Sequence, residues 1–356
     1  MGQSCCKPNV TDGTIDRPSN YNYILESEEE WCDARSEASF QSACSFTGKE
    51  EFPETSSQSV NFAIQQALTL RSLGRVLKAR EVLLSAVQDV EYWRYSTIRK
   101  VAAIIAVAEE VEKAYELLEC EEGYRVVRQE PLRILYKHEH GGTAHSIKIK
   151  ISLDHSVSHV ISIAYEWDLL KDWNKYAIDP IKFELQNPLE CAVYGAQWMM
   201  PPFKDFQSLL HTSGYDLSEE HGCLFIAIQN FDPRNFVAGD GHENIKLPDK
   251  ARRRKTIDFH QGSNICLRPV FGENGSSKTE AYLTVHLDPH IPFVPESLVN
   301  FVLHMLAPYL FRQINNILIR IFDDPTLKYA DRIESQPDVY GVIDAAVEEI
   351  RKRTCQ

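Results

Sequence analysis

Residues 282–317 read YLTVHLDPHIPFVPESLVNFVLHMLAPYLFRQINNI and carry the strongest fold signal in the chain. Residues 280–288 alternate with a period of two, which predicts a strand. From Pro295 the apolar residues recur at steps of three and four, which predicts one long helix with a wide apolar face as far as Ile321. Pro308 is expected to kink this helix. The positions on this face are Leu298, Phe301, Val302, Met305, Tyr309, Phe311 or Arg312, Ile314, Leu318 and Ile321.

Working back along the chain, the same period of two predicts strands at 124–128, 132–138, 145–153, 181–186, 191–199, 223–231 and 256–271. Within 145–153, Ile147, Ile149 and Ile151 share one face and two lysines share the other, which indicates a hairpin strand with one buried face. A helix is expected over 156–175, with Asp154 as a candidate cap. This order predicts an α+β fold in which a curved antiparallel sheet grips one helix and a long C-terminal helix closes it.

Four segments in this order resemble the START (steroidogenic acute regulatory-related lipid transfer) domain family, over about residues 123–322. They are GYRVVRQEPLRILYKHE at 123–139, VSHVISIAYEWDLLKDWNKYAID at 157–179, PPFKDF at 201–206 and the stretch at 282–317. The last is the most specific, because Asp288-Pro289, Ile291-Pro292 and Ala307-Pro308 all match the family in spacing.

The resemblance implies a hydrophobic tunnel for one lipid between the sheet and the closing helix, with that helix as a lid. It implies no cofactor, no metal and no catalysis. The expected lid residues are Leu298, Phe301, Val302, Met305 and Tyr309, and the expected sheet residues are Val193, Gly195, Ile226 and Val285. Which face of each strand points into the cavity stays open, because both faces of these strands are largely apolar.

Two charged residues could contact a polar head group. Lys204 stands where many family members have arginine, and Glu190 lies near the place of an acidic cavity residue in some members. The alternative is that Lys204 lies on the surface, with Asp205 capping a short helix at Phe206.

The N-terminus predicts membrane attachment. Gly2 offers the amine for myristoylation, and Cys5 and Cys6 are candidates for palmitoylation, which together give the two signals that a stable anchor needs. Residues 1–56 hold four basic and eleven acidic residues and few branched apolar ones, which predicts a disordered tether.

Residues 57–121 show helical spacing interrupted at Gly74 and predict a small all-helical segment before the main domain, 122–325. One unit of this segment is similar to half a tetratricopeptide repeat, but no second period follows. The segment is expected to pack as a helical cap, and 57–120 could contact a protein partner. Residues 326–356 are expected to be a tail with a short helix.

Arg252, Arg253, Arg254 and Lys255 form the densest basic cluster and could contact an anionic membrane surface. The alternatives are a solvated strand entrance and a nuclear signal. The net charge of −13 argues against nucleic acid as a partner. The longest apolar run is Val101–Ala108, so any membrane contact is expected to be peripheral and the protein cytoplasmic.

Together these observations predict a non-enzymatic protein that binds a single lipid, a sterol, phospholipid or sphingolipid, for lipid transfer or lipid sensing at membranes. One alternative is a membrane-tethered interaction or signalling scaffold that the lipid regulates. Another is a hydrolase or cyclase on the same fold, which the lack of Gly-x-Ser-x-Gly, Walker and zinc motifs disfavours.

Overall fold

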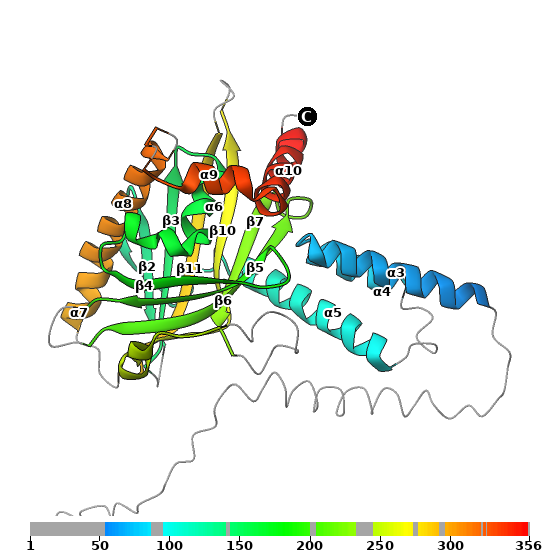
Figure 1. The fold of residues 1–356 in the computed structure, drawn as a ribbon, viewed down its shortest axis with the longest axis horizontal. Helices are drawn as coiled ribbons and strands as arrows, with labels where there is room; N and C mark the ends of the chain where they lie inside the picture. The colour runs from blue at the N-terminus through cyan, green and yellow to red at the C-terminus, as the bar shows by residue number, and fades with distance from the viewer. Residues whose placement is uncertain are drawn as a thin grey trace, which may run out of the picture. The chain divides into compact units, whose positions relative to one another are not determined.

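A curved antiparallel sheet forms the centre of the molecule (Figure 1). The computed structural model describes residues 54–86, 95–139, 143–199, 204–232, 245–272, 277–291, 296–321, 323–324 and 326–354. Residues 53–356 belong to one compact unit. The strands are β1(Arg125–Arg128), β2(Arg133–His138), β3(His145–Leu153), β4(Ala177–Glu184), β5(Glu190–Gln197), β6(Phe206–Leu217), β7(Cys223–Asn230), β8(Lys255–Thr256), β9(Asp258–Phe259), β10(Ser263–Phe271) and β11(Ser277–Asp288).

The strand order is β1-β2-β3-β11-β10-β7-β6-β5-β4, with β9 beside β11 and β8 parallel to β6. The predicted α+β, helix-grip fold is confirmed, with the strand at 145–153 placed as expected. Strand β6 was not predicted. The alternative of a short helix at Phe206 is wrong, because Phe206 pairs with Gln197 of β5 and with Lys255 of β8.

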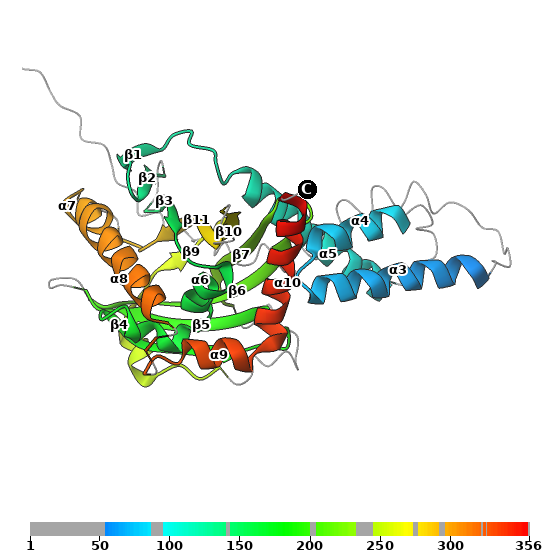
Figure 2. The ribbon, with the colours of Figure 1, turned by 90° about the horizontal axis from the view of Figure 1, so that it is seen from above.

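Helix α6(Val157–Tyr165) lies inside the curve of the sheet, between α8 and α10 (Figure 2). Its cap is Ser156, whose hydroxyl accepts the backbone N–H of His159 at 3.5 Å, and not Asp154, which pairs with Lys278 at 2.6 Å. The helix predicted over 156–175 ends at Glu166, which has non-helical backbone angles, and a 3₁₀ helix, η3(Trp167–Asp172), follows.

The predicted closing helix consists of α7(Glu296–Phe301), a π-helical segment η7(Val302–Leu306) and α8(Ala307–Arg320). The backbone N–H of Ala307 donates to the carbonyl of Val302, five residues back. Pro308, which has no N–H to donate, follows directly. The irregularity expected at Pro308 is therefore a wider turn just before it.

Part of the outer face of the sheet, on β6, β7, β10 and β11, packs against α3(Glu54–Ser72), α4(Val76–Ala86) and α5(Tyr95–Glu116). Gly74 separates α3 from α4 with a φ of +78°, a backbone conformation that glycine adopts without strain. Leu83 and Ile104 pack in one core with Phe225, Cys266 and other residues of the outer sheet face. The all-helical segment is thus part of the main core.

The end of this segment buries Lys148 on the outer face of β3, whereas Lys150 and Ser152 on the same face are exposed. Lys148 Nζ donates to the backbone carbonyls of Leu117, Leu118 and Cys120, just beyond the end of α5, at 2.5, 3.3 and 2.5 Å. The carbonyls near a helix C-terminus lack intrahelical partners, so the lysine satisfies them. Burial lowers the pKa of Lys148.

Two helices follow α8, in place of the expected tail with one short helix: α9(Tyr329–Ser335) and α10(Pro337–Thr354). Val339, Tyr340, Ile343 and Ala346 of α10 pack against α6, β7 and β10. Among the helices in the described ranges, none is long and apolar enough to cross a bilayer.

Candidate functional site

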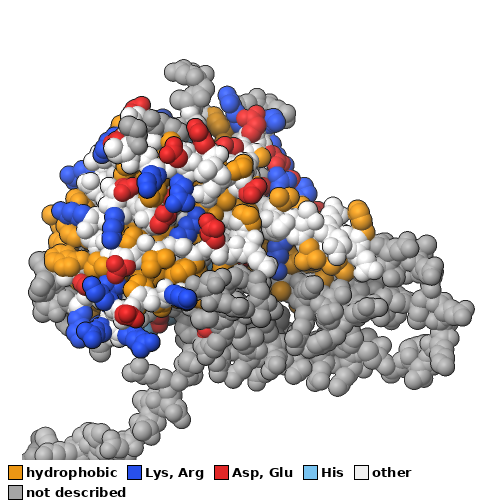
Figure 3. Space-filling model, viewed as in Figure 1, with side chains coloured by type: hydrophobic (Ala, Val, Ile, Leu, Met, Phe, Trp, Pro, Cys, Tyr) orange, Lys and Arg blue, Asp and Glu red, His pale blue; other side chains and the backbone are white. Residues whose placement is uncertain are grey.

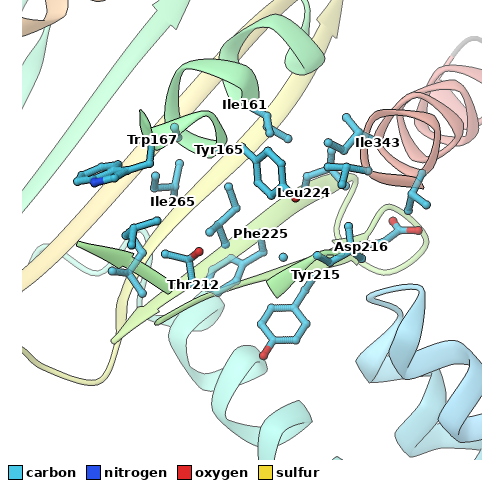
Figure 4. A pocket seen from close by; sticks show the side chains of 18 of the residues that line it. Ile161, Tyr165, Trp167, Thr212, Tyr215, Asp216, Leu224, Phe225, Ile265 and Ile343 are labelled. Atoms are coloured by element: carbon cyan, nitrogen blue, oxygen red, sulfur yellow. The ribbon is translucent and has the colours of Figure 1, made fainter. Parts of the chain in front are cut away.

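A cavity of about 120 Å³ lies between α6 and the inner face of β5, β6 and β7, with α10 as one wall (Figure 4). Apolar side chains dominate its lining. The lining residues are Ile161, Ala164, Tyr165, Trp167, Leu189, Val193, Leu210, Thr212, Gly214, Tyr215, Asp216, Leu224, Phe225, Ile226, Ile228, Ile265, Val339, Val342 and Ile343.

Strand alternation decides which residues reach this cavity. Along β7, Leu224, Ile226 and Ile228 share the inner face, whereas Phe225 packs against the helices on the outer face. The ring of Tyr215 also lies on the outer side, beyond the strands (Figure 4). The α6 side chains Ile161 and Tyr165 face the inner set across the cavity.

Helix α10 is fixed to α6 by a buried polar cluster around Glu166, whose exposed fraction is 0%. Glu166 Oε1 accepts the hydroxyl of Tyr340 at 2.9 Å and the amide of Gln336 at 3.2 Å. Lys182 and Arg332 each place a nitrogen 3.9 Å from Oε2. Burial and the charge of Glu166 raise the pKa of Tyr340, so its hydroxyl stays protonated as a donor.

Of the four predicted sheet residues, only two line the cavity. Val193 and Ile226 line the cavity. Gly195 lies beside the Trp167 ring, since a Cβ at this position would come 3.1 Å from Trp167 Cζ2. Val285 pairs with Ile147 on the inner face but outside this cavity.

The two predicted head-group residues also lie outside the cavity lining. Lys204 is exposed. Glu190 Oε2 lies 3.4 Å from Nε2 of His211, and its Oε1 accepts the amide of Asn187 at 3.0 Å. Burial tends to raise the pKa of Glu190, but the hydrogen bonds from His211 and Asn187 outweigh it and hold that pKa below its usual range.

In the second half of the closing helix, Ile314, Leu318 and Ile321 pack in one core with Leu153 and Ile163. In its first half, the side chains packed on the sheet are Val299, Leu303, Ala307 and Phe311. Phe301 and Met305 are 43% and 64% exposed, whereas Leu298, Val302 and Tyr309 are half-buried. The packed positions recur every four residues. The π-helical segment, with more residues per turn than an α-helix, rotates the inward face away from the positions expected for a regular helix.

The basic cluster does not act as one surface. Arg252, Arg253 and Lys255 are exposed. The side chain of Arg254 is 9% exposed and donates to Asp179 at 2.9 Å and to the hydroxyl of Tyr194 at 2.8 Å. In Figure 3, Lys and Arg side chains gather below the hydrophobic side chains that lie over α7. Gly2, Cys5 and Cys6 lie outside the described residues.

Sequence reasoning missed the walls that α10 and β6 supply. The amphipathic spacing of Val339, Val342, Ile343 and Ala346 could have predicted a packed helix. No sequence signal shows that this helix turns back onto α6, because that contact joins residues far apart in the chain.

No family model and no curated protein matches the chain. The fold is similar to solved structures. The chain covers 86% of human STARD10 with 65% of its own length, at 14% identity and a TM-score of 0.49. It covers 99% of human StAR-related lipid transfer protein 5 with 63% of its length, at 10% identity and a TM-score of 0.48. The chain covers 93% of the human StarD13 (DLC2) lipid transfer and protein localization domain with 58% of its own length, at 12% identity and a TM-score of 0.40.

Proposed function

We propose that the chain binds a single lipid in this cavity and transfers or senses it at membranes. The observation that carries the proposal is an apolar cavity on the inner face of the sheet, lined by residues such as Val193, Leu224 and Ile226. Apolar cavities of this kind stay dry and bind apolar molecules. The resemblance of residues 123–322 to START domains supports the same function.

The test is lipid uptake by the full chain. Native mass spectrometry of the protein purified from its own cells should show one co-purifying lipid of the sterol, phospholipid or sphingolipid class. An apolar fluorescent probe should bind and be displaced by that lipid. Absence of both the co-purified lipid and probe binding would contradict the proposal.

Location of the lipid is tested by filling the cavity. Ala164 of α6 lines it, so Ala164→Leu should weaken probe binding at least about tenfold, since overpacking a filled site is unfavourable. Ala106 of α5 is exposed, and Ala106→Leu is the matched control. Equal loss in both variants would place the probe elsewhere.

Membrane contact is proposed through exposed basic residues, exposed apolar residues and the N-terminus. Arg252, Arg253 and Lys255 are available to an anionic surface, where each cation contributes about 1 kcal/mol. Phe301 and Met305 present apolar side chains on the closing helix, which is the proposed lid. Gly2, Cys5 and Cys6 are the proposed acylation sites.

Vesicle sedimentation separates these contributions. The double substitution Arg252→Glu and Arg253→Glu should reduce binding to anionic vesicles and leave binding to neutral vesicles unchanged. Gly2→Ala should abolish myristate incorporation in cells. Unchanged binding and unchanged membrane partition in these variants would remove the respective parts of the proposal.

An interaction surface on the helical segment is a second candidate function. Phe62 on α3 is 72% exposed and Leu84 on α4 is 53% exposed. Deleting 57–120 would also remove part of the main core, so surface substitutions are the cleaner test. Phe62→Ser with Leu84→Ser should abolish partner recruitment in cells while lipid binding persists.

A further inference from the structure

We infer that the cavity recognises the end of an unsubstituted hydrocarbon chain and forms no hydrogen bond with the polar head of its ligand. This inference rests on the proposed function and narrows its ligand class. Any lipid whose chain can enter would bind, and the head group would stay outside the cavity.

The size of the cavity favours a single chain. At about 120 Å³ it is smaller than an engineered cavity of roughly 150 Å³ that binds benzene, and much smaller than the roughly 300–1,000 Å³ pockets that enclose drug-sized ligands. A fused ring system or two chains side by side would therefore need the walls to move.

The polar groups in the lining are already paired within the protein. The Tyr165 hydroxyl donates to the carbonyl of Pro188 at 2.9 Å, and Trp167 Nε1 donates to the carbonyl of Tyr194 at 2.9 Å. Thr212 Oγ1 lies 3.1 Å from Cys191 Sγ and 3.3 Å from the Cys191 carbonyl.

Asp216, at the edge nearest α4, is paired as well. Its Oδ2 accepts Arg75 Nε at 2.9 Å and its Oδ1 accepts the Ser218 backbone N–H at 3.0 Å. The donor hydrogens of Tyr165, Trp167 and Thr212 are thus already used, so a ligand carbonyl entering the cavity would have to displace one of these bonds or remain without a donor, which is unfavourable.

Lys182 Nζ and Glu166 Oε2 are two buried polar atoms without a hydrogen bond in the described ranges. Lys182 Nζ lies 3.3 Å from the centre of the Tyr165 ring. The other contact of this ammonium group is the carboxylate of Glu166 at 3.9 Å. The Tyr165 ring lines the cavity, whereas Lys182 does not, so the lysine contacts the ring and not the ligand.

The test uses the full chain and two ligand series of equal chain length, measured by displacement of an apolar fluorescent probe. In the first series only the head changes: a fatty alcohol, a fatty acid methyl ester and a monoacylglycerol. Their affinities should agree within about threefold, because the head makes no contact in the cavity. In the second series a keto group is placed near the far end of the chain, where the lining donors are already paired, and affinity should fall at least about tenfold.

A more than tenfold preference among the head groups, or an unchanged affinity for the keto ligand, would overturn the inference while leaving the proposed function intact. Failure of every ligand to displace the probe would instead count against the proposed function. Lys182→Met adds an independent check. The order of affinities among the three head groups should not change in this variant. A changed order would show that Lys182 contacts the head group. If this variant does not fold, the wild-type series still decides.

Discussion

The hydroxyl of Tyr340 donates to the carboxylate of Glu166 at 2.9 Å, and both side chains are buried. This bond joins the last helix of the chain to the end of α6, and the residues beside Tyr340 form a wall of the cavity. Asp344, one turn further along α10, accepts a second hydrogen bond from Ser158 of α6. The position of α10, and with it the shape of the cavity, depends on these buried polar contacts.

Tyr340→Phe should lower the free energy of unfolding by about 1.5–3 kcal/mol, the usual contribution of a hydrogen bond to a charged group. Chemical denaturation measures this change. Tyr176→Phe, which removes a hydroxyl outside the Glu166 cluster, is the matched control and should change stability little. Equal losses of unfolding free energy in the two variants would show that the hydrogen bond from Tyr340 to Glu166 contributes no measurable stability.

Gly341→Ala should stabilise α10. Gly341 is exposed within the helix, and a Cβ there meets no atom within 4 Å. Alanine restricts the unfolded chain and favours the helix, so the gain should be about 0.5–1 kcal/mol, measured by thermal unfolding. A loss of stability would mean that α10 is not helical at this position.

Gly195→Ala should have a different result, because its Cβ would come 3.1 Å from Cζ2 and Nε1 of Trp167. The ring lines the cavity, so its displacement should change the shape of the cavity. We expect a stability loss of about 1–3 kcal/mol and weaker binding of apolar probes. Tryptophan fluorescence would follow the displacement, and unchanged probe affinity would contradict the proposed lining.

Arg75, in the turn before α4, forms ion pairs with three carboxylates. Its guanidinium contacts Asp216, Glu219 and Glu349 at 2.9, 2.8 and 2.7 Å. Arg75→Met would leave Asp216, with a side chain 4% exposed, without its cation. Because Arg75 itself is 26% exposed, we expect a loss of about 2–4 kcal/mol, less than for a fully buried pair.

The matched control is Arg80→Met. Arg80 pairs with Glu112, whose side chain is 38% exposed, so this change should cost only about 0.5–1 kcal/mol. Urea denaturation of both variants tests the difference. Similar values for the two would show that the three-carboxylate contact contributes no more than an ordinary surface pair.

Acidification should destabilise the sheet where β3 pairs with β11. Ser146 Oγ lies 2.6 Å from Glu139 Oε1 and 2.6 Å from His286 Nδ1. The carboxylate of Glu139 can only accept, so the Ser146 hydroxyl donates its hydrogen to Glu139. The same hydroxyl oxygen then accepts the Nδ1–H of His286. Burial lowers the pKa of His286, with repulsion from Lys148 and His260 acting in the same direction against the attraction of Glu139. The folded state thus binds fewer protons than the unfolded state below about pH 6.5.

The contribution of neutral His286 to the free energy of unfolding is therefore fully present above about pH 6.5. It falls as the pH drops toward the lowered pKa of His286 in the folded state, by at most about 1.4 kcal/mol per pH unit for one group. His286→Asn keeps a partner for Ser146 and should flatten this part of the pH profile. His304→Asn, at an exposed position, should leave the profile unchanged. A profile that stays steep in His286→Asn would assign the dependence to other groups.

The local sequence patterns determined most strands of the sheet, the first part of the helix expected over 156–175, and the closing helix. Alternation in 145–153 and helical spacing after Pro295 are set by which side chains avoid water, and this information lies within each segment. Gly74 marked the turn between α3 and α4 because few other residues adopt its positive φ without strain.

Tertiary structure alone decided the composition of the cavity. A π-helical segment rotated the closing helix, so that Leu303 packs inward where Val302 and Met305 were expected. Helix α10 reached α6 through Tyr340 and Glu166, residues 174 positions apart. Hydrophobic periodicity reports which side of a segment is buried, but not which distant segment buries it, because that choice depends on packing and hydrogen bonds between parts of the chain brought together only by folding.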